Sequence, residues 1–285
     1  MIWLIIVSLL WAFSFGLIKT HLTTLDSTAV AAVRFAFALV IFIPLLRPKL
    51  ISWRNGALLV LIGAVQFGIM YAFYMASFAY LQSHEVALFT IFTPIYLTLI
   101  NGVLGKRFQL TWFIAAIISV VGAGVILWSK TDTTNIWVGF GLVQLSNFCF
   151  ALGQIAYKRL RPRLGEIRDD QLFGWLLLGG FISTGAYSLY ATDWAHFHPS
   201  LPQWGVIAYL GAIASGLGFF MWNRGVAQTN AGTLAVFNNM KIPLAVICSL
   251  LFFHSEANIP RLIVSFGLLA FAVWLAEKKH SSTEK

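Results

Sequence analysis

The chain has 285 residues, of which 59% are hydrophobic and only 10% are charged. Soluble domains carry roughly 25% charged residues, so a soluble fold of this length would lack the polar surface needed to cover its core. The net charge of +9 comes from basic residues scattered over several loops, not from the continuous basic stripe that binds nucleic acid. We therefore expect an integral membrane protein in a lipid bilayer, with no nucleic-acid partner.

Ten apolar stretches come close to the roughly twenty residues that a membrane-crossing helix needs. The first has no basic segment at its start and no small-residue cleavage pattern before Lys19, which favours a retained helix over a signal peptide. The predicted fold is all-α, with transmembrane helices at 2–18, 28–46, 55–79, 85–104, 111–129, 136–157, 171–191, 203–222, 231–253 and 260–276.

The positive charges predict the orientation of these helices. Most lysines and arginines fall in loops that follow even-numbered helices or in the C-terminal tail, whereas Lys19, Lys130 and Arg261 fall on the other side. Short loops rich in positive charge stay in the cytoplasm. We therefore expect both termini to be cytoplasmic and the protein to lie in a cell membrane, of the prokaryotic inner-membrane type.

A weak internal repeat divides the chain into two units. Placing Pro94 over Pro243 aligns the stretch 74–128 with 223–277 without a gap. Each half contains five helices, an odd number, so the second copy must sit upside down relative to the first. We expect a first repeat at 1–130 and an inverted second repeat at 131–285, the architecture of secondary transporters with a solute site near the midplane.

Several motifs resemble one transporter family over the whole chain. The opening Leu10-Trp11-Ala12-Phe13-Ser14-Phe15-Gly16-Leu17-Ile18-Lys19 looks like the first motif of the EamA family, within the drug/metabolite transporter superfamily. The Arg-Phe pair of Ala32-Val33-Arg34-Phe35 and the proline segments Phe92–Tyr96 and Lys241–Leu244 are also similar to that family. The chain departs from it at Ala12 and Lys106, where the family has glycine and glutamate.

The resemblance implies a ten-helix secondary transporter that moves a small organic solute without a cofactor. Many members of the family move amino acids and related carboxylates, mostly outward, so amino-acid export is the expected activity. We expect alternating access by rocking of the two five-helix halves. Ten helices suffice to enclose a cavity, so a monomer is the expected state.

The most informative ionisable residue is Lys241, because a charge in the middle of an apolar span is costly and marks a functional site. It lies about eleven residues into the ninth helix and shares a face with Asn238. Either Lys241 binds an anionic group of the solute, or it is a structural lysine bound to carbonyl oxygens. No carboxylate is expected at that depth, so the solute is predicted to be neutral, zwitterionic or anionic.

A second group is expected near the outer face. Arg34 lies roughly 10 Å below that face at 1.5 Å per residue, and Glu85 opens the fourth helix from the same side. A gating ion pair and direct solute contact are both compatible with this placement. The neighbouring His84 either titrates near neutral pH or is a solvated loop residue.

Amides and aromatic residues complete the candidate solute site. Gln144 and Asn147 follow one face of the sixth helix, where amides either line a cavity or bond neighbouring helices. Trp11, Tyr71 and Tyr74 are candidates for aromatic walls, with core packing as the alternative.

The two prolines that match in the repeat, Pro94 and Pro243, are the candidate hinges, because proline leaves backbone carbonyls free. No catalytic residue, metal site or cofactor is expected, since the chain lacks His-Glu-x-x-His and Gly-x-Ser-x-Gly motifs. An enzyme and a non-transporting membrane subunit are the competing classes.

Overall fold

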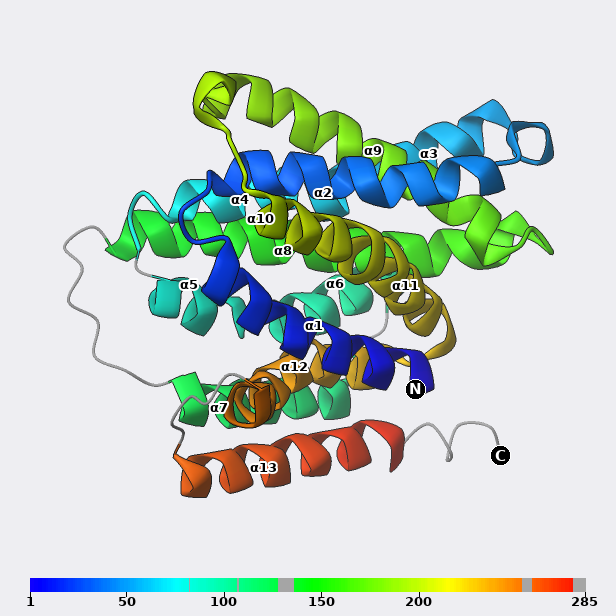
Figure 1. Cartoon of the computed structure of the whole chain (residues 1–285). Coiled ribbons are helices and arrows are strands. Elements are labelled where there is room, and N and C mark those ends of the chain that lie inside the picture. The colour runs from blue at the N-terminus through cyan, green and yellow to red at the C-terminus, as the bar shows by residue number, and fades with distance from the viewer. Residues whose placement is uncertain (82, 107, 128–135, 253–257, 279–285) are drawn as a thin grey trace.

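The computed structural model describes residues 1–81, 83–106, 108–127, 136–252 and 258–278 (Figure 1). Within these ranges the chain forms helices and no strand. Nine described segments are long and apolar enough to cross a bilayer, and Ile2–Ile18 is a tenth, shorter apolar stretch. The prediction of an all-α fold is confirmed, and nine spans plus one shorter apolar helix among the described residues agree with the ten predicted elements.

The helices run lengthwise through the bundle, and the first residue of the chain and the end of the last helix lie at the same end of it (Figure 1). We call this the basic end, because the segment 158–168 with its lysine and arginines also lies there. The elements are α1 (Ile2–His21), α2 (Ser27–Phe42), α3 (Trp53–Gly63), α4 (Met70–Ser77), α5 (Ser83–Thr90), α6 (Thr93–Gly105), α7 (Leu110–Leu127), α8 (Ile136–Leu160), α9 (Asp169–Ala191), α10 (Leu201–Tyr209), α11 (Gly218–Gln228), α12 (Ala231–Phe252) and α13 (Ile259–Lys278).

The third and eighth spans, predicted as uniform helices, each contain a π-helical segment. The segment η3 (Ala64–Ile69) joins α3 to α4, and η6 (Leu210–Leu217) joins α10 to α11. Both lie where a neighbouring helix comes very close. A Cβ on Gly68 would lie 2.0 Å from Ser183 Cβ, and one on Gly211 would lie 2.6 Å from Phe37 Cβ. Only glycine fits such contacts, and π-helical turns are common at functional sites.

The fourth span, predicted as one helix over 85–104, is broken. It consists of α5 and α6, with Ile91 and Phe92 in a turn between them. Pro94 lies in the first turn of α6, where its missing N–H is tolerated. The break therefore precedes the proline by two residues.

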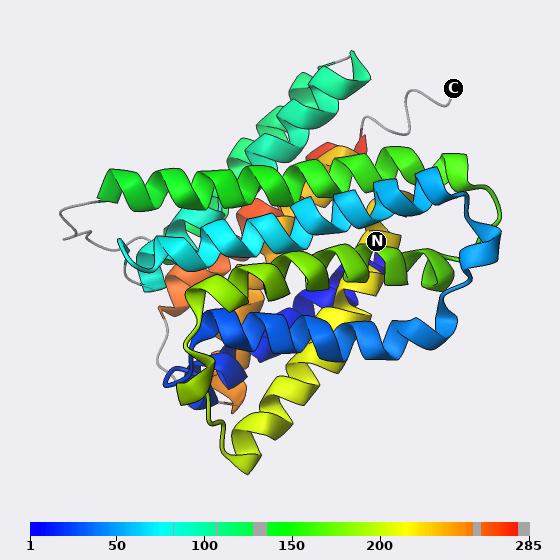
Figure 2. The same cartoon turned by 90° about the horizontal axis from the view of Figure 1, so that it is seen from above.

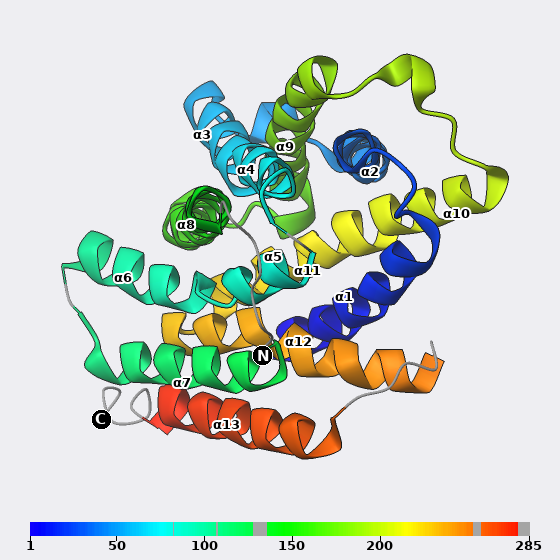
Figure 3. The same ribbon diagram turned by 90° about the vertical axis from the view of Figure 1, so that its left-hand side faces the viewer.

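The two halves of the sequence are interleaved in space. The closest helix pairs include α7 with α13, α1 with α12, α6 with α8, α2 with η6, and α9 with η3. Viewed end-on, α7 and α13 lie together, well away from the group of α2, α3 and α9 (Figure 3). Each of these pairs joins one half to the other. Rocking of the two five-helix halves stays a prediction.

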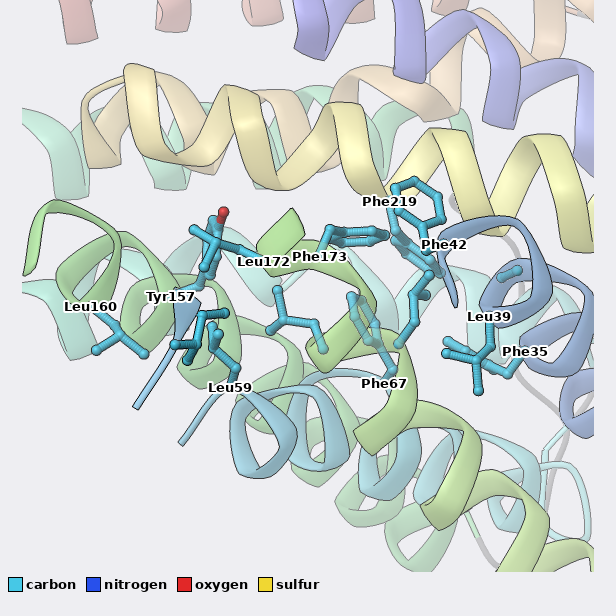
Figure 4. Packing of buried hydrophobic residues seen from close by; sticks show 14 of the residues in the cluster. Phe35, Leu39, Phe42, Leu59, Phe67, Tyr157, Leu160, Leu172, Phe173 and Phe219 are labelled. Atoms are coloured by element: carbon cyan, nitrogen blue, oxygen red, sulfur yellow. The ribbon is translucent and has the colours of Figure 1, made fainter. Parts of the chain in front are cut away.

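One large apolar core lies where α2, α3 and α9 pack side by side with α8 (Figure 2). Its rings come mainly from α2, η3, α9 and α11, and Figure 4 shows Phe42, Phe67, Phe173 and Phe219 directed toward one another. The ring centroids of Phe67 and Phe219 are 4.6 Å apart. This core fixes the position of η3 and α11, which both reach the centre of the bundle.

Candidate functional site at the centre of the bundle

The side chain of Lys241 lies on α12 in the middle of the bundle and is partly buried. Its Nζ lies 5.7 Å from the centroid of the Trp11 ring. Among the described residues no hydrogen bond or ion pair to this ammonium is present. An ammonium over an indole face is attracted by the ring, but its three N–H donors remain available for a ligand.

Trp11 is held in place from the other half of the chain. Its Nε1 donates to the carbonyl oxygen of Ala214 at 2.9 Å, inside the π-helical segment η6. Its ring lies 5.2 Å from the ring of Phe219 and 5.0 Å from that of Trp222. The indole face is thereby oriented toward Lys241 by a hydrogen bond and two ring contacts.

Trp11, Tyr71 and Tyr74, the candidates for aromatic walls, are connected through neighbouring rings, and their role as a wall for the solute stays a prediction. The rings of Tyr71 and Tyr74 lie 6.3 Å apart, and Phe35 joins Tyr71 at 5.7 Å to Phe219 at 6.2 Å. We call these rings the central aromatic cluster: Trp11, Phe35, Tyr71, Tyr74, Phe219 and Trp222. It faces the centre from α1, α2, α4 and α11.

Four buried amides form a layer next to this cluster, which we call the amide layer. Gln66 Nε2 donates to Asn223 Oδ1 at 3.0 Å. Gln154 and Asn238 pair loosely, with both amide contacts at 3.5 Å, and Gln154 Oε1 also accepts from Trp222 Nε1 at 3.2 Å. All four amides are at most 3% exposed. Asn238 was expected at the site, and the structure brings it together with three amides from other spans.

The basic end is closed beneath the amide layer. Leu4, Leu97, Trp222 and Leu234 belong to one fully buried apolar cluster there. Lys158 caps the end of α11, donating to the carbonyl of Val226 at 2.9 Å and to that of Thr229. Lysine is favourable at a helix C-terminus, where carbonyl oxygens are otherwise unpaired.

An ion pair adds to this closure. Arg224 on α11 lies 3.6 Å from the carboxylate of Asp169 at the start of α9, and its guanidinium lies 4.7 Å from the Trp3 ring centroid. Arg161 also binds Asp169. The starts of α1 and α9 are thus tied to the end of α11. Lys241, Trp11, Tyr71 and Tyr74 remain partly accessible, whereas the residues of the amide layer and of the apolar cluster beneath it are buried.

Gln144 and Asn147, two expected solute ligands, bind the break in the fourth span. Both donate to the carbonyl oxygen of Phe89, at 3.2 and 2.8 Å. Asn239 on α12 donates to the carbonyl oxygen of Ile91 at 3.0 Å. The carbonyls that the break leaves without a helical partner therefore receive amide donors from two other spans, as backbone groups inside a membrane must.

Of the three residues expected near the outer face, Arg34, Glu85 and His84, the structure gives a described hydrogen bond for Arg34. Arg34 Nη2 donates to Ser215 Oγ of η6 at 3.0 Å. Glu85 is completely buried in the first turn of α5, where a carboxylate is favoured by the helix dipole. His84 also belongs to α5, and its side chain lies outside what the structure describes. An ion pair between Arg34 and Glu85 stays a prediction.

The two hinge candidates differ in their surroundings. Pro94 begins α6 after the break, whereas Pro243 lies inside α12, which stays helical through it. The two prolines align in the sequence repeat, but the helices around them differ in geometry. The repeat boundary at 130 falls among residues that the structure does not describe and stays a prediction.

Several residues of the centre were not expected from the sequence. Gln66 and Asn223 are isolated amides, Asn239 directly follows the expected Asn238, and Phe219 and Trp222 are two of many aromatics. Gln154 was noticeable on the polar face of the sixth helix, but its bond to Trp222 joins distant spans. A search for every amide within the predicted spans would have found Gln66 and Asn239, whereas Asn223 lies one residue beyond the predicted end of its span.

Among the described residues, one ammonium, several aromatic rings and four buried amides meet at the centre of a many-helix bundle, an arrangement typical of multi-pass membrane transporters of small molecules. The EamA-like transporter family matches residues 1–128 and again residues 137–276. The chain belongs to this family, as its motifs predicted, and the double match agrees with two related units.

Curated relatives cover almost the whole chain. It is 38% identical over 282 residues to a protein named biotin transporter in Salmonella typhimurium, covering 96% of this chain and 92% of that protein. It is 37% identical to the biotin transporter of Escherichia coli K12, again covering 96% of this chain and 92% of that protein. A probable biotin transporter of Pseudomonas aeruginosa is 36% identical, with 96% of each chain covered.

A solved structure supports the fold. A chain titled "Crystal structure of protein" matches with a TM-score of 0.78 and 15% sequence identity, covering 94% of this chain and 92% of that one. At this identity the match concerns the fold alone.

Proposed function

We propose that this protein transports biotin across the inner membrane by alternating access. The observation that supports this most directly is the unsatisfied ammonium of Lys241 over Trp11, in a chain 36–38% identical to proteins named biotin transporter or probable biotin transporter. Biotin replaces the amino acid expected from the sequence: it is a carboxylate, as predicted, but it has no amino group. A net outward direction likewise stays a prediction.

The chemistry of biotin fits the centre of the bundle. Its carboxylate would accept hydrogen bonds from the Lys241 ammonium, and charge-assisted bonds of this kind are about twice as strong as neutral ones. Its fused rings and aliphatic chain suit the faces of Trp11, Tyr71 and Phe219. A site that is mostly apolar, with a few convergent polar groups, is the usual form of a small-molecule pocket.

The closure of the basic end suggests which step the structure represents. The N-terminus, the end of α13 and most of the positive charges lie at that end, so we expect it to face the cytoplasm. The structure then corresponds to the state that receives solute from the outside. Opening to the cytoplasm requires α11 to separate from Lys158 and Asp169.

The test is transport by the purified protein in liposomes. Vesicles of bacterial lipid containing the protein are given radiolabelled biotin, with and without an imposed proton gradient, and uptake and efflux are both timed. Saturable biotin flux above that of empty vesicles supports the proposal. A subunit without transport activity would give no flux, and flux of amino acids without biotin would restore the earlier expectation.

A further inference from the structure

We infer that the amide layer, made of Gln66, Gln154, Asn223 and Asn238, is the part of the site that recognises the ureido ring of the solute. This inference rests on the proposed function, and it assigns the second polar group of biotin to residues of this chain. A ureido group presents two N–H donors beside one carbonyl acceptor. Carboxamide side chains offer the complementary groups, since each has two donors and an acceptor.

The first observation is that the layer is buried and incompletely satisfied. Gln66 is 0% exposed and Asn223 is 1% exposed. They share one hydrogen bond of 3.0 Å. Within the described residues Gln66 Oε1 and Asn223 Nδ2 have no hydrogen-bond partner. Leaving a buried polar atom unpaired costs about 1–3 kcal/mol, so an unmatched acceptor beside an unmatched donor points to a ligand that supplies both.

The second observation is the loose pair in the same layer. Gln154 and Asn238 face each other with both amide contacts at 3.5 Å, beyond the usual range of N–H···O bonds. Asn238 Nδ2 also donates to the carbonyl oxygen of Leu234 at 2.9 Å, and Gln154 Oε1 accepts from Trp222. The long contact between the two amides is therefore the one that a ligand can replace. Both residues are at most 3% exposed, so their polar atoms have little access to bulk water.

The third observation is the position of the layer relative to Lys241. Asn238 precedes Lys241 by three residues on α12, about 4.5 Å along the helix axis, and the two lie on neighbouring positions of one face. Trp222, which bonds to Gln154, has its ring 5.0 Å from that of Trp11 beneath Lys241. A solute with its carboxylate on Lys241 would thus direct its ring end past Trp11 toward the amides.

Recognition at this layer would also affect the closed end. Gln154 Oε1 holds Trp222 Nε1, and Trp222 belongs to the apolar cluster that closes the basic end. A ureido ring that takes the Gln154 amide as its partner competes with that bond. Solute binding would then loosen Trp222, and with it α11, which links recognition to opening.

The experiment compares biotin with lipoate, a carboxylate with the same aliphatic chain on a sulfur-containing ring but without a ureido group. Radiolabelled biotin is bound to the purified full-length protein, and unlabelled lipoate and desthiobiotin, which keeps the ureido ring, compete for it. The variants are Asn238→Leu and the milder Asn223→Ser. The matched control is Asn239→Leu, because Asn239 adjoins Asn238 on α12 but binds Ile91 and Ser119 outside the layer.

The wild type should bind biotin and desthiobiotin roughly a hundredfold or more tightly than lipoate, since a site built for hydrogen bonds rejects analogues that lack them. Each layer variant should reduce the biotin-to-lipoate ratio roughly tenfold while lipoate affinity is kept. Asn239→Leu should leave the ratio unchanged. An unchanged ratio in both layer variants would overturn this inference alone, whereas a wild type that binds no biotin would overturn the proposed function as well.

Discussion

The ammonium of Lys241 and the indole ring of Trp11 come from the ninth and first spans and meet at the centre of the bundle, 5.7 Å apart. Trp11 is bonded to η6 through Ala214, so the pair joins three spans around the only lysine within the described part of α12. The position of Lys241 makes this lysine the first target for mutation.

Replacing Lys241 with methionine should weaken biotin binding by roughly 10- to 100-fold, because a hydrogen bond to a charged group is worth about 1.5–3 kcal/mol. Lys241→Arg, which keeps the charge with a different shape, should lose less. Equilibrium binding of radiolabelled biotin measures both. Biotin methyl ester, which has no carboxylate, is the matched ligand control and should bind the wild type and Lys241→Met equally. A selective loss of ester binding in the variant would contradict the assignment.

Two variants of Trp11 distinguish the contribution of its aromatic ring from that of its indole N–H. Trp11→Phe keeps an aromatic face near Lys241 but removes the donor to Ala214, and we expect a several-fold rise in KM with a retained maximal rate. Trp11→Ala removes the cation–π contact, worth about 0.5–2 kcal/mol, and the contacts with Phe219 and Trp222. It should impair transport much more. Equal effects of both variants on initial transport rates would show that the ring itself is not used.

Asn147 should contribute to stability and not to solute choice. Asn147→Leu removes the 2.8 Å bond to the carbonyl of Phe89, and an unsatisfied buried group costs about 1–3 kcal/mol. A fall of a few degrees in melting temperature is expected for a chain of this size, measured by thermal unfolding in detergent. The ratio of biotin to lipoate affinity should not change. A variant with unaltered melting temperature but altered selectivity would place Asn147 in the solute site after all.

Lys158 should hold the basic end closed. In a background of Cys149→Ser and Cys248→Ser, a Leu234→Cys reporter lies in the buried cluster of that end. Lys158→Met removes the donor to the carbonyls of Val226 and Thr229, so labelling of the reporter by a thiol reagent should become several-fold faster. Arg163→Met, which removes one exposed charge from the same end, is the control and should label like the parent. Equally slow labelling in both variants would exclude a role for Lys158 in the closure.

The class of fold follows from composition and from the lengths of the apolar stretches, because the bilayer imposes both. The central position of Lys241 was also predicted from the sequence, since a lysine in a long apolar stretch is conspicuous. The bounds of most spans agree with the structure within a few residues. Such features depend only on local composition.

The break at Ile91–Phe92 and the π-helical segments depend instead on contacts between distant spans. Pro94 and Pro243 are similar in sequence, yet only the first follows a break, where amides of α8 and α12 supply donors. Gln66 and Asn223 form a pair only because η3 and α11 meet. The sequence pattern of one span does not indicate which other span it will contact. The amide layer, which is built from several spans, could therefore not be predicted.

The hydrogen bonds at the break also bear on how the protein is made. The carbonyls of Phe89 and Ile91 belong to the fourth span, whereas their donors, Asn147 and Asn239, belong to the sixth and ninth. A chain synthesised from its N-terminus presents the fourth span long before either donor leaves the ribosome. Lipid supplies no donor in the meantime. The break at Ile91–Phe92 therefore cannot gain its donors before the sixth and ninth spans have entered the membrane, so the first repeat reaches its final form only after the second has been inserted.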